Sequence, residues 1–227
     1  RLNGNVIDVD AVNRQVALED GTIFSGSALI IATGVSRRRL NVPGEAEFEG
    51  RGILRSGARD KESVSGHEVV IVGGGDAALE NALILSEFAA KVTVVHRRNA
   101  FTARAEFIEQ ARDRSNLEFL PRTLVKRITG DERLRSIELA EPATGREFVI
   151  PADALLVRIG VKPNTETLAG KLELDQKGYI VVDSICRTNA HGVFSVGDAA
   201  CPLSPTITTA AGMGATAAKA AFSLLVR

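Results

Sequence analysis

A run of glycines after a short apolar segment is the part of this sequence that most clearly indicates chemistry. Gly73 and Gly75, with Ala78 three residues later, match the G-x-G-x-x-G/A spacing of dinucleotide-binding turns. In such turns the first glycine allows a tight bend, the second lets the backbone approach a pyrophosphate, and the small third residue lets helix and strand pack closely. The free N–H groups and partial positive charge of the following helix face the phosphates. The predicted contact residues are Gly73, Gly75, Asp76, Ala77 and Ala78.

The segments around these glycines are the ones that a nucleotide-binding turn requires. Residues 69–72 form a continuous apolar run, typical of a strand buried on both faces of a parallel sheet. Small and apolar residues at helical spacing extend to about Ala90, and a second strand is expected at residues 92–95. Strand, helix and strand within about 30 residues form one βαβ unit. A glycine-rich turn in an unrelated α/β domain is the alternative, and the surrounding pattern favours the nucleotide site.

The end of the second expected strand indicates which nucleotide is bound. A carboxylate at this point would hold the ribose hydroxyls of NAD, but the sequence has His96, Arg97 and Arg98 there. A carboxylate would repel the additional phosphate of NADP, whereas guanidinium groups bind a phosphate through charge-assisted hydrogen bonds. These residues favour NADP over NAD. Solvated arginines at a strand end are the alternative.

The composition excludes several classes of function. The chain has 227 residues, of which 44% are apolar and 25% charged, so it can bury the core of one large or two small domains. Lys and Arg number 28, as do Asp and Glu, and Trp is absent, which argues against a nucleic-acid partner. No apolar run approaches the roughly 20 residues that cross a membrane, and no signal peptide opens the chain. The two cysteines, Cys186 and Cys201, suit neither a disulfide framework nor a metal site. The sequence predicts a cytoplasmic protein with no bound metal and no membrane partner.

The rest of the chain alternates short strands with helices. Strands are expected at residues 6–9, 15–18, 28–31, 154–157, 179–182 and 193–196 and between 117 and 150, and helices near 102–114 and from about 206. Asp20-Gly21 is a hairpin signal, and residues 35–66, rich in Gly and Arg, are typical of a connector. The segments 28–35 and 154–161 are similar to each other and flank the βαβ region. This repetition suggests two crossings between two domains.

Together these segments resemble the low-molecular-weight thioredoxin reductase family of flavoproteins, which are pyridine nucleotide-disulfide oxidoreductases. The resemblance covers nearly the whole chain in order, and the set is more specific than any single motif. It is carried by Ile30-Ile31-Ala32-Thr33-Gly34, Val42-Pro43-Gly44-Glu45, Val72-Gly73-Gly74-Gly75-Asp76-Ala77-Ala78, His96-Arg97-Arg98 and Gly192-Val193-Phe194-Ser195-Val196-Gly197-Asp198.

The resemblance implies an α/β fold in which a Rossmann-like NADPH-binding domain is inserted into a second Rossmann-like domain that binds FAD. Residues 1–40 and 159–227 correspond to the middle and C-terminal parts of the FAD-binding domain, and residues 41–158 to the insertion. The family's first βαβ segment, whose own glycine-rich turn holds the FAD pyrophosphate, precedes anything in this sequence. The single methionine, Met213, agrees with a missing beginning. The FAD site is therefore expected to be incomplete in this chain.

The resemblance also assigns cofactor contacts beyond the glycine-rich turn. For FAD these are Thr33-Gly34 and Gly197-Asp198, with the Asp198 carboxylate on the ribityl chain. The family's flavin contact at the start of the last helix falls on Pro205, Thr206 and Ile207, where the backbone N–H groups of Thr206 and Ile207 would reach the ring. A further family arginine near the 2′-phosphate of NADP aligns with Thr102. Arg104, two residues on, either substitutes for it or is a solvated helix residue.

One departure from the family pattern concerns the redox centre. The family's Cys-x-x-Cys-Asp, at a fixed distance before the glycine-rich turn, falls on Ser56, Arg59 and Asp60. Serine and arginine cannot form a disulfide or carry two electrons as a dithiol. A dithiol relay to thioredoxin is therefore not expected at its usual place, and the catalytic residues are unknown. Asp60 remains as a weak candidate acid, and a solvated or capping carboxylate is its alternative role.

The predicted function is that of a FAD-dependent NAD(P)H oxidoreductase resembling thioredoxin-disulfide reductase, which passes hydride from NADPH to FAD and electrons on to an acceptor. The acceptor is a small redox protein, thioredoxin-like or a ferredoxin or flavodoxin, or a small molecule. A ferredoxin– or flavodoxin–NADP reductase of the same fold is the first alternative, and a non-catalytic NADP-binding sensor is the second. By analogy with the family, a homodimer is expected. Arginines that offer a docking surface for an acidic carrier, or are solvated, are Arg37, Arg38, Arg39, Arg51, Arg55 and Arg59.

Overall fold

The chain divides into two compact units in the computed structural model, which describes residues 2–226. One unit comprises the chain up to Ser36 and again from Val161, and the other comprises Arg37–Gly160. One unit thus interrupts the other in sequence, and the boundaries expected after residues 40 and 158 lie within a few residues of the observed ones. The α/β fold class is confirmed, whereas the assignment of each unit to a cofactor stays a prediction.

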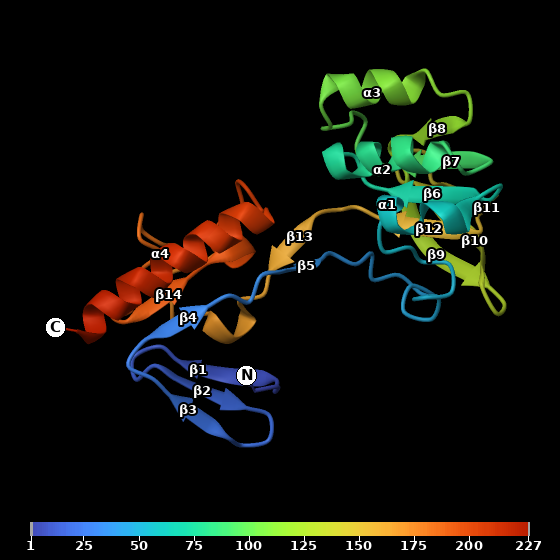
Figure 1. Ribbon diagram of the computed structural model, residues 1–227. Coiled ribbons are helices and arrows are strands. Elements are labelled where there is room, and N and C mark those ends of the chain that lie inside the picture. The colour runs from blue at the N-terminus through green and yellow to red at the C-terminus, as the bar shows by residue number, and fades with distance from the viewer. Residues whose placement is uncertain (1, 227) are drawn as a thin grey trace. The chain divides into compact units, whose positions relative to one another are not determined.

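A parallel sheet of four strands forms the centre of the unit 37–160 (Figure 1). Its order is β12 (Ala154–Val157), β6 (Glu68–Val72), β7 (Lys91–Val95) and β8 (Leu117–Leu120). The runs Val69–Ile71 and Val94–Val95 are at most 1% exposed. Consecutive buried residues show that both faces of the sheet are covered, as the unbroken apolar runs predicted.

One face of this sheet is covered by helices α2 (Asp76–Ser86) and α3 (Ala105–Arg112), with Val69 and Ile71 of β6 in that core. Both helices are shorter than expected from the sequence. The helix α2 ends before Ala90 because the N–H of Ala90 donates to the carbonyl of His67 (2.9 Å), which draws the chain into β7. The helix α3 begins after residue 102 because the N–H groups of Thr102 and Ala103 donate to the carbonyl of Gly74.

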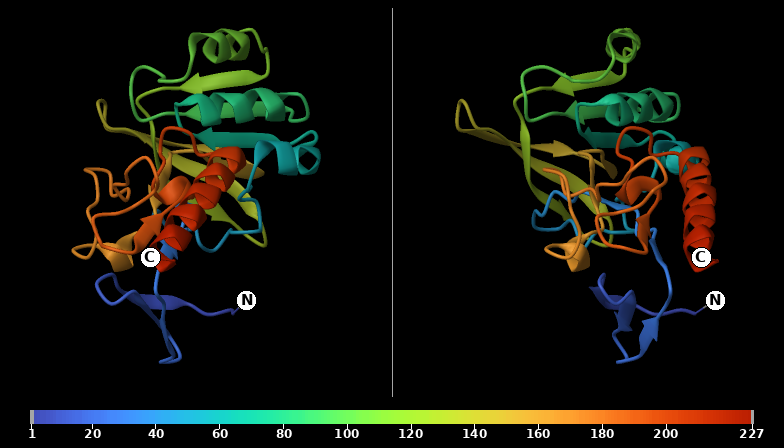
Figure 2. Two further views of the ribbon diagram at one scale, coloured as in Figure 1. Left: turned by 60° about the vertical axis from the view of Figure 1, so that its left-hand side comes forward. Right: turned by 90° about the vertical axis from the view of Figure 1, so that its left-hand side faces the viewer.

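The opposite face packs against an antiparallel sheet, as the two views of Figure 2 show. Its strands, in the order β11-β10-β9, are β9 (Leu124–Gly130), β10 (Leu134–Glu141) and β11 (Arg146–Pro151). Val70 and Val72 of β6 join Ile137 and Leu139 of β10 in this second core. Because side chains alternate along a strand, β6 supplies both cores at once.

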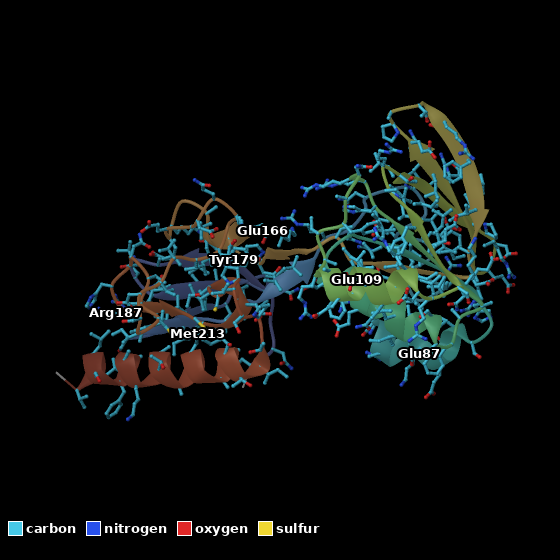
Figure 3. The ribbon with its side chains drawn as sticks, turned by 90° about the horizontal axis from the view of Figure 1, so that it is seen from above. Glu87, Glu109, Glu166, Tyr179, Arg187 and Met213 are labelled. Atoms are coloured by element: carbon cyan, nitrogen blue, oxygen red, sulfur yellow. The ribbon has the colours of Figure 1, made fainter. Side chains whose placement is uncertain are left out.

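The other unit contains a small antiparallel sheet and one parallel pair of strands. Its elements are β1 (Val6–Asp10), β2 (Gln15–Leu18), β3 (Ile23–Ser25), β4 (Leu29–Ile31), β14 (Val193–Ser195), the short helices η2 (Glu166–Leu168) and η3 (Gly197–Ala199), and the long helix α4 (Ile207–Leu225). β4 and β14 run parallel, with Ile31 opposite Ser195. The helix α4 packs on Phe194 and Val196 through Ala217 and Ala221, and Met213 points from α4 toward the strands (Figure 3).

The strand expected at residues 179–182 is wrong, since only an isolated bridge between Leu174 and Ile180 forms there. The carboxylate of Asp175 accepts hydrogen bonds from the N–H groups of Lys177 (2.8 Å) and Tyr179 (2.9 Å). Such local side-chain bonds compete with strand pairing and close a turn instead. The hydrogen bonds of Asp175 therefore decide the structure of this segment, although its apolar alternation is that of a strand.

The segment expected as a plain connector contains regular structure. It holds β5 (Val35–Arg37), which pairs with β13 (Val161–Pro163), then α1 (Gly57–Asp60) and η1 (Lys61–Val64). The two similar segments of the sequence therefore end in paired strands, and each reaches its strand through a glycine with positive φ, Gly34 (+64°) and Gly160 (+94°). Across residues 2–226, no helix is long and apolar enough to cross a membrane.

Candidate functional site

The three glycines that follow β6 differ in the space around them. Gly73 has φ +155°, and a Cβ there would lie 2.2 Å from the carbonyl oxygen of Arg158. A Cβ on Gly74 would lie 2.3 Å from the ring of His96. Around Gly75, by contrast, the nearest atom to an added Cβ is Oγ1 of Thr102, at 3.8 Å. The fold explains the first two glycines, while the space beside Gly75 is open, as a bound pyrophosphate requires.

The start of α2 offers free hydrogen-bond donors beside that space. Gly75 precedes the helix in an extended conformation and accepts hydrogen bonds from the N–H groups of Ala78 (2.9 Å) and Leu79 (3.2 Å). Within residues 2–226, the N–H groups of Asp76 and Ala77 have no protein acceptor. Unsatisfied N–H groups and the helix dipole make such a terminus suited to an anion. The predicted contacts at Gly73, Gly75, Asp76, Ala77 and Ala78 thus lie on one turn.

Arg104 is held at this turn by carboxylates. Its backbone N–H donates to Asp76 (2.7 Å), and its guanidinium pairs with Asp76 (3.2 Å) and Glu106 (2.8 Å). The same guanidinium lies 4.3 Å from the ring centre of Phe107. These contacts engage the guanidinium of Arg104 with two carboxylates and an aromatic ring, so neither role that the sequence left open, a substitute for the family arginine or a solvated helix residue, is decided by them. Thr102, which the sequence comparison aligned with a family arginine, is the side chain nearest to Gly75.

His96 packs under the glycine-rich turn instead of standing in solvent. Its ring lies against Gly74 and 5.1 Å from the ring of Phe101, and its Nε2 is buried without a hydrogen-bond partner. Burial lowers the pKa of His96 below 6.5, and the charges of Arg98 and Arg97 lower it further, against a hydrogen bond to the backbone of Ala100. A neutral, packed imidazole shapes the turn, and it adds no positive charge for a phosphate.

Arg97 and Arg98 are exposed at the carboxyl end of β7, and within residues 2–226 their side chains have no ion pair or hydrogen bond. The structure adds a third arginine that the sequence analysis missed. Arg122 has an uncommon positive φ (+54°), and its N–H donates to the carbonyl of Arg98 (3.1 Å). The adjacent Thr123 donates to the carbonyl of His96 (3.0 Å). No local pattern could have indicated this, because the pairing of β7 with β8 brings residues 96–98 and 122–123 together.

The residues predicted to contact FAD lie at the carboxyl ends of two adjacent strands. β4 leads to Thr33 and Gly34, and β14 leads to Gly197 and Asp198, so the parallel pairing brings both to the same edge. Gly34 has φ +64° and no atom within 4 Å of an added Cβ, and Asp198 is half-exposed. Ligands of open α/β sheets bind at such carboxyl edges.

At the start of α4 the two predicted flavin contacts differ. The N–H of Thr206 donates to the carbonyl of Ser204 (2.9 Å), and its hydroxyl accepts from the N–H of Thr209 (3.2 Å). Within the described part of the chain, the N–H of Ile207 has no acceptor, and its side chain is 90% exposed. Of the two, Ile207 is the residue whose backbone is free to meet a ligand.

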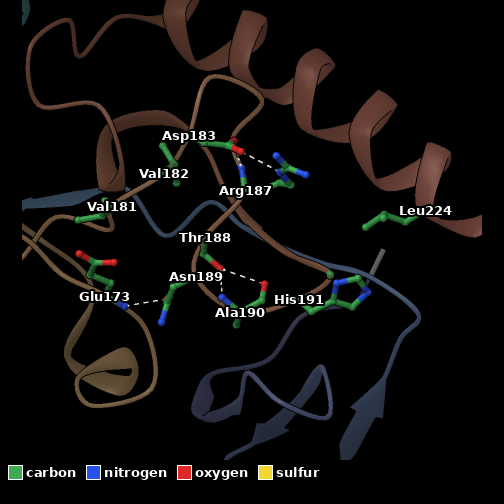
Figure 4. A pocket seen from close by; sticks show the side chains of 11 residues that line it. Glu173, Val181, Val182, Asp183, Arg187, Thr188, Asn189, Ala190, His191 and Leu224 are labelled. Carbon is green, nitrogen blue, oxygen red and sulfur yellow. Dashed lines mark hydrogen bonds and ion pairs between the residues drawn. The ribbon is translucent and has the colours of Figure 1, made fainter.

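A cavity of about 570 Å³ in the same unit lies away from these residues (Figure 4). Several polar groups that line it bond to one another: Asn189 accepts from the N–H of Glu173 (2.9 Å), and Arg187 pairs with Asp183 (2.8 Å). None of the predicted site residues lines this cavity. Among residues 2–226, no cluster of three His, Cys, Asp or Glu side chains could hold a metal ion.

Comparison with known proteins places the chain in a family. The family model for pyridine nucleotide-disulphide oxidoreductases matches residues 1–217. The chain belongs to this family. It is 36% identical to a thioredoxin reductase of Peptoclostridium litorale, over 96% of this chain and 71% of that protein, and 36% identical to one of Mycolicibacterium smegmatis, over 92% and 69%. The chain thus spans roughly two thirds to seven tenths of the length of these relatives.

Solved structures of the same family agree with the fold. The thioredoxin reductase of Lactococcus lactis, in its FR conformation, superposes with a TM-score of 0.82 at 31% identity, over 98% of this chain and 74% of that one. The thioredoxin reductase of T. acidophilum superposes with a TM-score of 0.80 at 27% identity, over 99% and 74%. This chain is therefore a thioredoxin reductase-like member of the pyridine nucleotide-disulphide oxidoreductases.

This family member carries no thiol in the unit 37–160, since its two cysteines are Cys186 and Cys201. Ser56 and Arg59, at the predicted cysteine positions, lie immediately before and within the short helix α1. One carboxylate oxygen of Asp60 accepts from the N–H groups of Arg55 (2.6 Å) and Ser56 (2.9 Å). These two bonds are those of a capping carboxylate, and an acid role for Asp60 stays a prediction.

The buried cysteine is not activated as a nucleophile. Cys186 is 4% exposed, in the core between β14 and α4, and its S–H faces the carbonyl of Met213 at 3.7 Å. Burial raises the pKa of the Cys186 thiol, and the charge of Asp183 raises it further. Reactive cysteines have lowered pKa values in electropositive surroundings, so Cys186 is typical of a packed thiol.

Substitution of Gly73 and of Gly75 by alanine distinguishes an effect on stability from an effect on NADPH binding. Gly73→Ala drives a Cβ into the carbonyl of Arg158, and we expect it to lower the free energy of unfolding by about 2 kcal/mol or more. Gly75→Ala has room for its Cβ, so we expect a change below about 1 kcal/mol in stability but at least a roughly tenfold loss of NADPH affinity. Urea denaturation and fluorescence titration measure the two effects.

Gly212→Ala, in α4 and with no atom within 4 Å of its added Cβ, is the control for both substitutions. Unchanged NADPH binding by the Gly75→Ala variant would contradict a pyrophosphate site at this turn.

The partly buried imidazole of His96 predicts a pH dependence of stability. Because the pKa of His96 in the folded state lies below 6.5, the unfolded chain binds more protons between these two values. The contribution of His96 to the free energy of unfolding is complete above about pH 6.5 and falls as the pH is lowered through that window. His96→Phe keeps a ring against Gly74 and removes this dependence, whereas His67→Gln retains it. Urea denaturation at several pH values measures it, and equal profiles for both variants would count against the assignment.

Proposed function

We propose that this chain binds NADPH in the unit 37–160 and, within the intact protein, works as a FAD-dependent oxidoreductase of the thioredoxin reductase-like class. The observation that carries the proposal is the turn after β6, where the space beside Gly75 is open and the N–H groups of Asp76 and Ala77 are free. The likeness to thioredoxin reductases over most of the chain supports the same cofactors.

In this proposal each group at the turn has a defined task. The N–H groups of Asp76 and Ala77 bind the pyrophosphate, and Gly75 lets the backbone come close to it. The ring of His96 packs against Gly74 and supports the turn. The bound cofactors supply the redox chemistry, which is hydride donation by the nicotinamide and hydride acceptance by the flavin.

Selection of NADPH over NADH is assigned to three arginines. Arg97 and Arg98 are exposed and unpaired within residues 2–226, and Arg122 is joined to Arg98 through the backbone. Guanidinium groups bind a phosphate through paired, charge-assisted hydrogen bonds, so the 2′-phosphate is held where these residues meet. Arg104 is not included, because Asp76 and Glu106 already bind its guanidinium.

In the other unit, Asp198 and the Thr33-Gly34 segment are proposed to hold part of FAD at the carboxyl edge of β4 and β14. Asp198 is half-exposed and, within residues 2–226, its carboxylate has no hydrogen bond, so it is free to accept one from a ribityl hydroxyl. The N–H of Ile207 is the corresponding donor at the start of α4.

The acceptor follows from the residues at the predicted thiol positions. Since Ser56 and Arg59 cannot relay electrons as a dithiol, we propose that reduction of thioredoxin through that position does not occur. A ferredoxin or flavodoxin, or a small molecule, fits a flavin that passes its electrons on directly. For an acidic carrier, the exposed Arg55 and Arg59 are candidates, whereas Arg39 is paired with Glu49 (2.6 Å). A homodimer stays an expectation from the family.

Substitution of the arginines tests nucleotide choice. Arg97→Gln, Arg98→Gln and Arg122→Gln are each expected to weaken NADPH binding about tenfold and to leave NADH binding unchanged, since only NADPH carries the 2′-phosphate. Arg112→Gln, on the exposed side of α3, is the matched control. Isothermal titration with both nucleotides measures the effect. An equal loss for NADH would assign these residues to another part of the nucleotide or to the fold.

Reduction of flavin tests the oxidoreductase itself. The chain is mixed anaerobically with FAD and NADPH, and the visible flavin absorbance is expected to bleach faster than in FAD and NADPH alone. Electron transfer from the reduced mixture to ferredoxin, compared with thioredoxin, then identifies the acceptor class. Tight NADPH binding with no bleaching would instead support the non-catalytic sensor, and thioredoxin reduction would overturn the proposed role of Ser56 and Arg59.

A further inference from the structure

Two guanidinium groups of the unit 37–160 converge on one backbone carbonyl. Arg158 donates from Nη2 to the carbonyl of Arg55 (2.8 Å) and from Nη1 to the carbonyl of Val157 (2.9 Å). Arg37 donates from Nη1 to the same carbonyl of Arg55. Both guanidiniums therefore donate to the same oxygen, so the two positive charges lie next to each other.

No carboxylate neutralises this pair. Within residues 2–226, neither Arg37 nor Arg158 forms an ion pair with an acidic side chain. Asp60 is the nearest acidic influence, but its hydrogen bonds go to the N–H groups of Arg55 and Ser56. A carbonyl accepts hydrogen bonds but carries no net charge, so the excess of positive charge persists.

The repulsion is felt most strongly by Arg158, whose side chain is half-buried. Burial lowers the pKa of Arg158, the charge of Arg37 lowers it further, and Asp60 acts in the opposite direction. Placing two like charges together in a partly buried position costs free energy unless an opposite charge joins them. This arrangement is typical of a site that an anion completes.

The pair stands at the edge of the sheet where ligands of α/β folds bind. Arg158 directly follows β12, and its N–H donates to the carbonyl of Val72 at the end of β6 (2.7 Å). Arg55 directly precedes Ser56 and α1, which hold the positions that the family resemblance assigned to the dithiol. The pair therefore borders the turn of Gly73 on the side of β12, whereas Arg97 and Arg98 follow β7 on the other side of β6.

We propose that Arg37 and Arg158 form a second anion site, which binds the carboxylate or phosphate group of a small molecule beside the position where a dithiol would lie. Each guanidinium has five N–H donors, and the hydrogen bonds above use one from Arg37 and two from Arg158. Because Arg37 is exposed, a ligand reaches the pair from solvent. If the proposed oxidoreductase function holds, this site gives the acceptor its chemical class, an anionic small molecule.

Titration calorimetry with two probes tests the site. Sodium phosphate and sodium succinate are titrated separately into the full chain, with ionic strength held constant by sodium chloride. We expect saturable one-to-one binding of at least one probe, weakened at least about tenfold in Arg158→Gln and in Arg37→Gln, a factor that corresponds to about 1.4 kcal/mol. Arg112→Gln, which also removes one positive charge, is expected to bind as the wild type. The probe that binds decides between a phosphate and a carboxylate ligand.

Two further measurements keep the outcome clear. The probes are titrated again with NADPH present in excess and in Arg97→Gln, and binding is expected to persist in both, since the nucleotide phosphates lie on the other side of β6. NADPH affinity of Arg158→Gln is expected to stay within about twofold of the wild type. If the wild type does not bind NADPH, the proposed function is refuted but the anion site is not, because the anion site does not require the nucleotide.

Three results would overturn the proposal: no saturable binding of either probe, equal weakening in Arg112→Gln, or displacement of the probe by NADPH. Circular dichroism checks that each variant is folded. If Arg158→Gln is unfolded, binding of the probes to Arg37→Gln and to Arg158→Lys tests the site instead. Lysine keeps the positive charge but loses the planar fork of the guanidinium. Unchanged binding in a folded Arg37→Gln variant would then also reject the site.

Discussion

The close approach between Gly73 and the carbonyl of Arg158 is the constraint on which the proposed nucleotide site depends. β6 and β12 pair in parallel, and the bond from the N–H of Arg158 to Val72 (2.7 Å) continues that pairing to the last residue of β6. The chain can turn away from the sheet at this point only through a residue without a side chain. The side chain of Arg158 is held separately, by hydrogen bonds to the carbonyls of Val157 (2.9 Å) and Arg55 (2.8 Å).

Positive charge and free N–H groups are concentrated along this one edge of the sheet. The chain as a whole has equal numbers of basic and acidic residues, so its net charge gives no sign of an anion site. Yet the carboxyl ends of β12, β6 and β7 carry, in order, Arg158, the free N–H groups of α2, and Arg97 with Arg98. Many carboxylates lie elsewhere in exposed ion pairs, such as Lys91 with Glu118 (2.7 Å) at the opposite end of these strands. The distribution of charge, and not its sum, supports the binding of anionic groups along this edge.

The sequence predicted those features that are encoded locally. The apolar run of β6, the glycine spacing and the helical spacing of α2 are consecutive, so the βαβ unit and its turn followed directly. The role of Gly74 could not be predicted, because the ring that excludes its Cβ belongs to His96, at the end of the next strand. Arg122 was missed for the same reason, since only the pairing of β7 with β8 brings it to Arg98. At residues 179–182 the apolar alternation predicted a strand that does not form. There a local interaction decides the structure, because the carboxylate of Asp175 accepts hydrogen bonds from nearby N–H groups and closes a turn.

The segment at which the family resemblance places a dithiol has a different arrangement of side chains in this chain, with Ser56 and Arg59 at the expected cysteine positions. Asp60 remains where the resemblance places the family's acid, but its carboxylate bonds to the backbone on either side of the Arg55–Ser56 peptide and fixes the carbonyl between them. That carbonyl is the one on which Arg37 and Arg158 converge. The aspartate and the two arginines therefore bond to the same peptide segment, Asp60 to its N–H groups and the arginines to its carbonyl. Through these hydrogen bonds Asp60 helps to hold two positive charges at the carboxyl edge of the parallel sheet.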